Sequence, residues 1–110
     1  GLIMEQITIF FKKEVLESFN ELVFELYSKN YFASLEYAID YKDKLVSFIN
    51  NSIASFPHKT TPNKLKHFGE QYIFYNSNQR TTWYVFFKQH EQIYIITAIL
   101  NNHSHHAKHL

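Results

Sequence analysis

Residues 69–100 read GEQYIFYNSNQRTTWYVFFKQHEQIYIITAIL, and the rest of the chain is organised around this segment. Polar turns at 76–80 and 89–91 divide it into three runs rich in aromatic and β-branched residues, which favour pleated strands: Gln71–Tyr75, Thr81–Lys88 and Gln92–Leu100. This arrangement predicts an antiparallel meander. Apolar residues occupy both faces of its strands, as at Trp83 and Tyr84. We therefore expect other elements to cover one face and an aromatic patch to lie on the other.

Two helical segments precede the meander and can supply the cover. From Lys12 to Ser28, apolar residues recur at helical spacing and glutamates fill many of the other positions. A second helix follows Asn30, a suitable N-cap, and runs to about Ser55, with an apolar stripe that includes Phe32, Leu35 and Ile39. The short connection predicts an antiparallel helical hairpin.

Before the helices, Gln6–Phe11 alternates as a strand does. It has no hairpin partner nearby, so it must pair with a strand of the meander. The predicted order is β-α-α-β-β-β, a two-layer α+β sandwich with the helical hairpin packed on a mostly antiparallel sheet. A basic loop, His58–His67, joins the layers, and residues 101–110 form a polar tail.

The length of 110 residues predicts a single domain, residues 1–110. Gly1 is not a translation start, so we expect Gly1–Ile3 to be a cloning remnant and Met4 the native start. No apolar run reaches the roughly 18 residues that span a membrane, and the first residues lack signal-peptide features. We therefore expect a cytoplasmic protein. The absence of cysteine excludes disulfides, a cysteine nucleophile and thiolate metal ligands.

The net charge of +1 conceals an asymmetry along the chain. Residues 1–56 hold five lysines and eight acidic residues, whereas residues 57–110 hold six basic and two acidic residues together with all seven histidines. A basic, histidine-rich surface beside aromatic residues suits a phosphate or nucleic-acid partner. An acidic solvent face on the helices would produce the same asymmetry, and composition does not decide between the two.

The whole chain resembles the RelE/ParE family of bacterial type II toxins, also called plasmid-stabilisation proteins. The resemblance lies in the element order and in a set of shared positions. These are Ala38 within the second helix, Leu45, Ile49, Ile53 and Pro57 at its end, Lys64-Leu-Lys66 before Gly69, the strand Tyr72–Tyr75, and Ile93–Leu100 before a polar tail.

The resemblance implies a bacterial toxin neutralised by a cognate antitoxin, with no cofactor, in a homodimer or a toxin–antitoxin hetero-oligomer. One branch of the family inhibits translation by cleaving mRNA at the ribosome. The other branch inhibits DNA gyrase and is not an enzyme. An inactive relative that serves as a protein-interaction domain is a third alternative.

RNA cleavage of this kind needs no metal ion. A base deprotonates the 2′-hydroxyl, a cation stabilises the phosphoryl charge, and an acid protonates the leaving oxygen. The candidate catalytic residues are Arg80, the only arginine; Lys64 and Lys66, the family's basic pair; and His103 after the last strand. Each could instead be a solvated loop residue.

The candidate RNA-binding residues are Trp83 and Tyr84, which could stack on bases, and His67, which adjoins the basic pair. His105 and His109 have helical metal spacing, but no carboxylate lies near them in the sequence, and we predict no metal site. Three features favour the gyrase branch or an inactive relative over a nuclease: the near-neutral charge, the lack of arginine in Gln71–Tyr75, and histidines in place of arginines in the tail.

Overall fold

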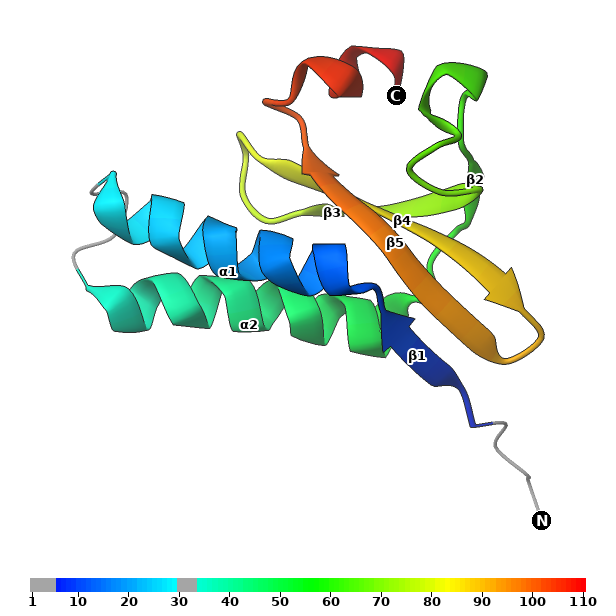
Figure 1. The fold of residues 1–110 in the computed structure, drawn as a ribbon, viewed down its shortest axis with the longest axis horizontal. Helices are drawn as coiled ribbons and strands as arrows, with labels where there is room; N and C mark the ends of the chain where they lie inside the picture. Colours follow the sequence, from blue (N-terminus) through cyan, green and yellow to red (C-terminus); the bar gives the residue numbers. More distant parts are fainter. Residues whose placement is uncertain (1–5, 30–33) are drawn as a thin grey trace.

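The computed structural model describes residues 6–29 and 34–110 (Figure 1). The predictions for Gly1–Ile3, Met4, Asn30 and Phe32 lie outside these residues. In chain order the elements are β1 (Thr8–Phe11), α1 (Lys13–Ser28), α2 (Leu35–Ser52), β2 (Lys59–Thr60), the 3-10 helix η1 (Asn63–Leu65), β3 (Gln71–Asn76), β4 (Thr82–His90), β5 (Ile93–Asn101) and the 3-10 helix η2 (His105–His109).

The five strands form one mixed sheet in the order β1-β5-β4-β3-β2. β3, β4 and β5 pair antiparallel with their sequence neighbours, which confirms the meander. β1 lies parallel to β5, from Thr8 opposite Ile93 to Phe11 opposite Ile96, so the prediction that the first strand joins the meander is also confirmed. The loop predicted at 58–67 contains two short elements instead, β2 on the edge of β3 and then η1.

The helical hairpin covers one face of the sheet, as predicted. α2 begins after Ser34, whose Oγ accepts a hydrogen bond from the backbone N–H of Tyr37 at 3.3 Å. The hydrophobic core lies between the two layers and comprises Val15, Phe19, Leu45, Ile49, Ile53, Ile73, Trp83, Val85, Phe87, Tyr94 and Ile96. The residues of β3, β4 and β5 that alternate with these point to the opposite face, which we call the open face.

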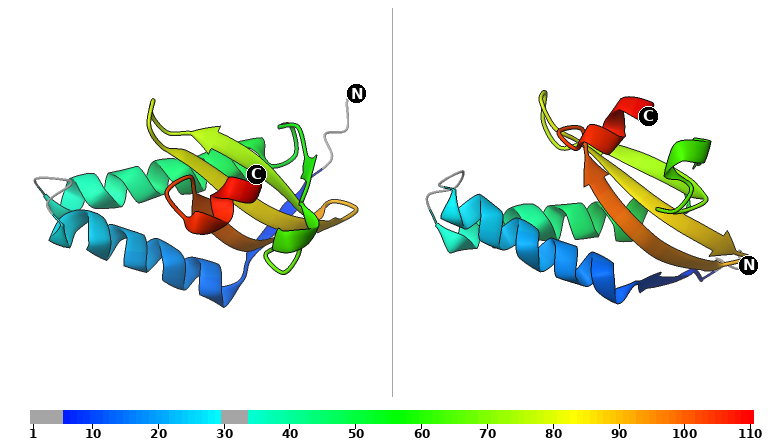
Figure 2. Two further views of the ribbon diagram at one scale, coloured as in Figure 1. Left: turned by 90° about the horizontal axis from the view of Figure 1, so that it is seen from above. Right: turned by 45° about the horizontal axis from the view of Figure 1, so that its top comes forward.

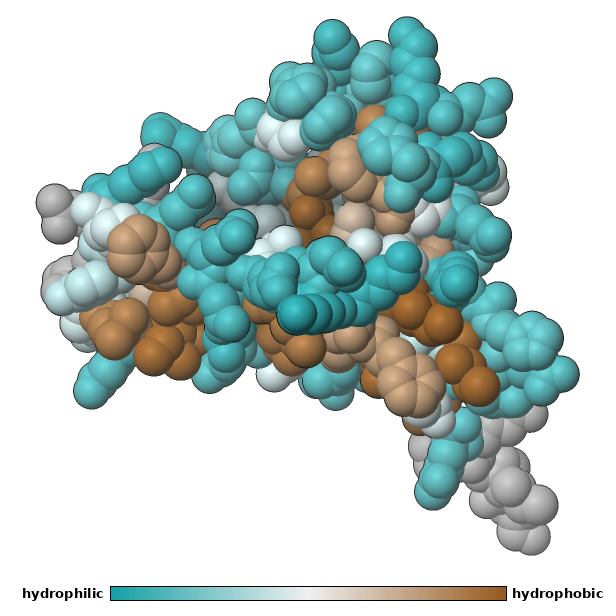
Figure 3. Space-filling model, viewed as in Figure 1, coloured by the Kyte–Doolittle hydropathy of each residue, from teal (hydrophilic) through white to brown (hydrophobic). Residues whose placement is uncertain are grey.

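The free end of the hairpin extends past the sheet (Figure 1). Phe24 and Tyr27 of α1 and Leu35 and Ile39 of α2 are exposed there, although helical spacing placed Leu35 and Ile39 on the apolar stripe. The reason is that the sheet does not reach this end. Figure 3 shows brown, hydrophobic patches on the surface of the hairpin at this end.

η1 and η2 lie against the open face, on the side opposite the hairpin (Figure 2). Phe68, just after η1, packs on Phe86 of β4 with ring centroids 5.6 Å apart. Gly69 permits this close approach, because a Cβ there would lie 2.5 Å from Thr97 Oγ1 and 2.9 Å from Phe86 Cβ. The predicted polar tail, residues 101–110, contains the last residue of β5 and the 3-10 helix η2, which packs on β5 and η1.

None of the described helices is long and apolar enough to cross a lipid bilayer.

Candidate functional site

The open face carries a groove of about 310 Å³ over β3 and β4. Its lining combines aromatic, polar and basic side chains from three strands and the end of the chain: Lys59, Tyr72, Phe74, Asn76, Thr82, Tyr84 and Leu110. We call this the open-face groove. Its aromatic residues alternate with core residues along β3 and β4, so their position follows from the two-residue period of a strand.

The groove has an aromatic floor and a cation at its β2 edge. The rings of Tyr72 and Tyr84 meet edge to face with centroids 6.0 Å apart, and Lys59 Nζ lies 5.8 Å from the centre of the Phe74 ring. Burial raises the pKa of the Tyr72 hydroxyl, with a smaller contribution from Tyr84 beside it. Tyr72 therefore stays protonated at neutral pH and can donate a hydrogen bond.

A second group of residues, the η1–η2 basic cluster, lies beside this groove. It consists of Lys64, His67, His105, His106, Lys108 and His109. The His67 and His106 rings have centroids 6.4 Å apart, and His105 lies 3.9 Å from His106 by the same measure. Phe68 holds the two elements together, because its ring centroid lies 4.1 Å from that of His67 and 5.1 Å from that of His106.

Two histidines of the cluster have lowered pKa values. Desolvation lowers the pKa of His106 below 6.5, and the charges of His105, His67, His109 and Lys108 lower it further. The pKa of His109 is lowered by desolvation first and then by Lys64, Lys108 and His105. At neutral pH both imidazoles are therefore mainly uncharged, which is the form that can accept a proton.

Arg80 lies in the turn between β3 and β4. The turn adjoins one end of the open-face groove, the end that Asn76 and Thr82 line. Asn78 Oδ1 shapes this turn by accepting the backbone N–H of Arg80 at 2.8 Å and that of Thr81 at 2.9 Å. The side-chain amide of Asn102 donates to the Arg80 carbonyl at 2.9 Å, which links the turn to the end of β5. Arg80 and the basic cluster thus lie on different parts of the open-face region.

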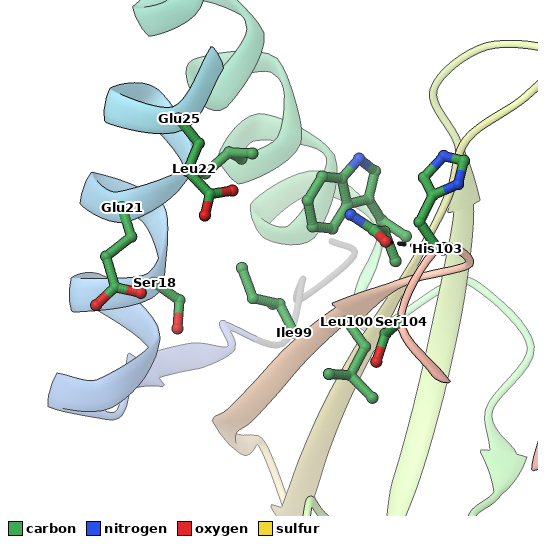
Figure 4. A pocket seen from close by; sticks show the side chains of 10 residues that line it. Ser18, Glu21, Leu22, Glu25, Ile99, Leu100, His103 and Ser104 are labelled. Carbon is green, nitrogen blue, oxygen red and sulfur yellow. Dashed lines mark hydrogen bonds between the residues drawn. The ribbon is translucent and has the colours of Figure 1, made fainter. Parts of the chain in front are cut away.

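His103 is near Arg80 but not in the basic cluster. Its Nε2 lies 3.5 Å from Thr81 Oγ1, and its ring lines a different groove, between α1 and β5 (Figure 4). Lys66 is exposed beside η1, and its Nζ donates to the Glu70 carbonyl at 3.4 Å. The four predicted catalytic residues are therefore distributed over two places: Lys64 and Lys66 at η1, and Arg80 and His103 at the turns.

The structure separates the two predicted stacking residues. Tyr84 is half-buried in the open-face groove. Trp83 lies on the opposite face of β4 with 5% of its surface exposed, and its indole N–H donates to Tyr41 Oη at 2.9 Å. The prediction that Trp83 binds RNA is therefore corrected, because its ring packs in the core beneath the helices.

The cations of this region are available to an anionic ligand. The ion pairs found among the described residues all lie on the hairpin, and none includes Lys59, Lys64, Lys66 or Arg80. In the same part of the chain, no group of three His, Cys, Asp or Glu side chains is placed to hold a metal ion.

Sequence reasoning missed Lys59 as a site residue, did not choose Tyr72 from among the aromatic residues of the strands, and gave little weight to the histidines of the tail. Tyr72 could have been found from its parity, because it alternates with Ile73 as Tyr84 does with Val85. Nothing in the local sequence places η2 against η1, since that contact depends on Phe68 packing between His67 and His106.

Comparison of the chain with models of protein families, with curated proteins and with solved structures finds no match. The resemblance to the RelE/ParE family therefore stays a prediction.

Proposed function

We propose that this chain is the toxin of a type II toxin–antitoxin pair of the RelE/ParE kind, and that it cleaves mRNA at the ribosome without a metal ion. The observation that carries the proposal is the open face itself. An aromatic groove, with Tyr72 and Tyr84 in its floor, lies beside a cluster of lysines and weakly basic histidines. Single-stranded RNA binding needs both features, stacking platforms and cations that follow the backbone.

The η1–η2 basic cluster supplies groups for the proton transfers. Uncharged His109 or His106 accepts the proton of the 2′-hydroxyl, whose oxygen then attacks the adjacent phosphorus. Lys64 stabilises the negative charge that builds on the phosphoryl oxygens. A protonated histidine of the cluster donates a proton to the departing 5′-oxygen, so the products are a cyclic 2′,3′-phosphate and a free 5′-hydroxyl. Arg80, at the other end of the groove, binds a neighbouring phosphate.

The direct test is a cell-free translation reaction supplied with purified protein, in which mRNA ends are mapped by primer extension. We expect new 5′ ends within translated codons and loss of protein synthesis. Lys64→Ala with His109→Ala should abolish both effects. Lys12→Ala, which removes a lysine next to α1 on the opposite side of the sheet, should leave cleavage unchanged. Intact message in an uninhibited reaction would refute the proposal.

Inhibition of DNA gyrase is the second candidate function. It is favoured by the exposed hydrophobic end of the hairpin, where Phe24 has 70% of its surface exposed, because such a surface suits contact with another protein. The low net charge of +1 agrees with this alternative. A supercoiling assay distinguishes the two, since a gyrase inhibitor would stop supercoiling and leave mRNA intact.

The partner proposed for either activity is a cognate antitoxin. Co-expression with the product of an adjacent short reading frame should restore growth to cells that the chain alone inhibits. A chain that never slows growth would instead be an inactive relative used as an interaction domain.

A further inference from the structure

β5 is covered by β1 along only part of its length. The two strands pair from Ile93 to Ile96, and the chain then leaves the sheet at Lys12, whose backbone N–H donates to the Ile96 carbonyl at 3.0 Å. From Thr97 to Asn101, β5 has β4 as its only strand neighbour among the described residues. This part of the sheet therefore has a free edge, which lies beside α1 in both views of Figure 2.

The backbone of this edge is oriented to accept another strand. Asn102 donates its N–H to the Thr82 carbonyl at 3.0 Å, so it faces β4. Because successive residues of a strand direct their N–H and C=O groups to opposite sides, Ile99 and Asn101 face away from β4. The Asn101 carbonyl accepts the N–H of Ser104 at 3.1 Å. The strand registers and loop contacts of the described residues give no backbone partner to the Ile99 N–H and C=O or to the Asn101 N–H.

A groove of about 330 Å³ runs between this edge and α1 (Figure 4). Its floor is apolar and includes Leu22, Trp83 and Ile99. Glu21 and Glu25 stand on the α1 side, and neither makes an ion pair with a described residue. His103 stands at the opposite end, so the negative charge is confined to the wall made by α1. We call this the edge groove.

We propose that the edge groove binds an extended polypeptide segment, which adds to β5 as a further strand. Its backbone would pair with Ile99 and Asn101, its apolar side chains would contact the floor, and its lysines or arginines would face Glu21 and Glu25. Strand addition is a common mode of peptide recognition, in which the sheet edge supplies affinity and alternate side chains supply specificity. A bound helix would leave the edge groups of β5 without partners.

This inference does not rest on the proposed RNA-cleaving function. The edge groove lies between α1 and β5, whereas the open-face groove lies over β3 and β4. An RNA ligand on the open face and a polypeptide in the edge groove would contact different residues.

The probe is a set of fluorescein-labelled octapeptides that alternate valine, isoleucine, phenylalanine or tyrosine with lysine or arginine. Fluorescence anisotropy with the full chain should show saturable binding of members of this set. Matching peptides with glutamate in place of the basic residues should bind at least about tenfold more weakly. Peptides N-methylated at alternate residues, on the edge that would face β5, keep their side chains but lose the backbone donors, and they should not bind.

Variants of the chain locate the site. Glu21→Lys together with Glu25→Lys should weaken binding of the basic peptides by about tenfold or more. Glu14→Lys changes an exposed glutamate on α1 that does not line the groove, and it should leave binding unchanged. Ser18 is a half-buried residue of the groove lining, so Ser18→Tyr should block peptide binding. Thermal unfolding of each variant checks that it is folded.

Amide hydrogen exchange provides a second readout. The bound peptide should slow exchange at Ile99 and Asn101 specifically, since these N–H groups would become hydrogen-bonded. The inference is overturned if no peptide of the set binds, if N-methylation has no effect, or if the two amides exchange at the same rate with and without peptide.

Discussion

Single residues on β4 have opposite roles because their side chains alternate between two apolar faces. Trp83 packs under the hairpin and donates to Tyr41 Oη, which in turn lies 2.9 Å from Ser77 Oγ. Tyr84, the next residue, lines the open-face groove beside Tyr72. Chemical similarity of the two aromatic side chains therefore says little about which one meets a ligand.

This difference predicts opposite effects of substitution. Tyr84→Ala should weaken binding of labelled single-stranded RNA by roughly 5- to 150-fold, which corresponds to the loss of about 1–3 kcal/mol of base stacking. Trp83→Phe should leave RNA affinity unchanged and lower the free energy of unfolding by about 1–2 kcal/mol, because it removes a partly buried hydrogen bond and some packing.

Fluorescence anisotropy measures the first effect, and urea denaturation measures the second. A Trp83→Phe protein that is stable but has lost RNA affinity would place the ligand on the hairpin side of the sheet instead.

At the scale of elements, the hydrophobic pattern was sufficient to predict both helices, the meander and the pairing of the first strand with it. These follow from the period of apolar residues and from the lack of any other partner for Thr8–Phe11. The pattern could not say which face of β4 the helices cover, because Trp83 and Tyr84 are both large and apolar. It also could not show η2, whose polar residues are ordered by contact with His67 and Phe68 of a distant segment.

Packing of η2 on η1 predicts a pH-dependent stability. The folded protein holds the pKa values of His106 and His109 below 6.5, with desolvation as the largest single cause, whereas in the unfolded chain both histidines titrate near 6.5. As the pH falls from neutral through 6.5 and then through the lowered values, the unfolded chain binds protons first, so the folded state loses stability. The charges of Lys64, His67, His105 and Lys108 oppose protonation in the same direction.

Urea midpoints measured between neutral pH and mildly acid pH will test this. The midpoint of the parent protein should fall over this window, and the fall should be smaller after His106→Gln with His109→Gln. His90→Gln, which changes an exposed histidine at the end of β4, should leave the pH profile unaltered. An equal fall in all three proteins would mean that the two η2 histidines are not the titrating groups.

In the whole molecule, the charged residues divide the surface into two regions, the helical hairpin and the open face. The hairpin carries most of the acidic residues and all ion pairs found among the described residues, and the open face carries cations that no described carboxylate neutralises. The low net charge therefore results from two opposed regions, and it does not describe the surface that a ligand would meet. An anionic ligand should approach the open face, and a basic polypeptide should approach α1.

This separation of charge predicts how RNA affinity responds to salt. Each cation that contacts a phosphate of single-stranded RNA releases a counterion, so the logarithm of the association constant should fall linearly with the logarithm of salt concentration. Lys64→Ala should reduce the steepness of that line by about 0.7, the value for one phosphate contact on a single strand, and Arg80→Ala should do the same. Lys12→Ala, next to α1, should not change it. Parallel lines for all four proteins would show that RNA does not bind the open face.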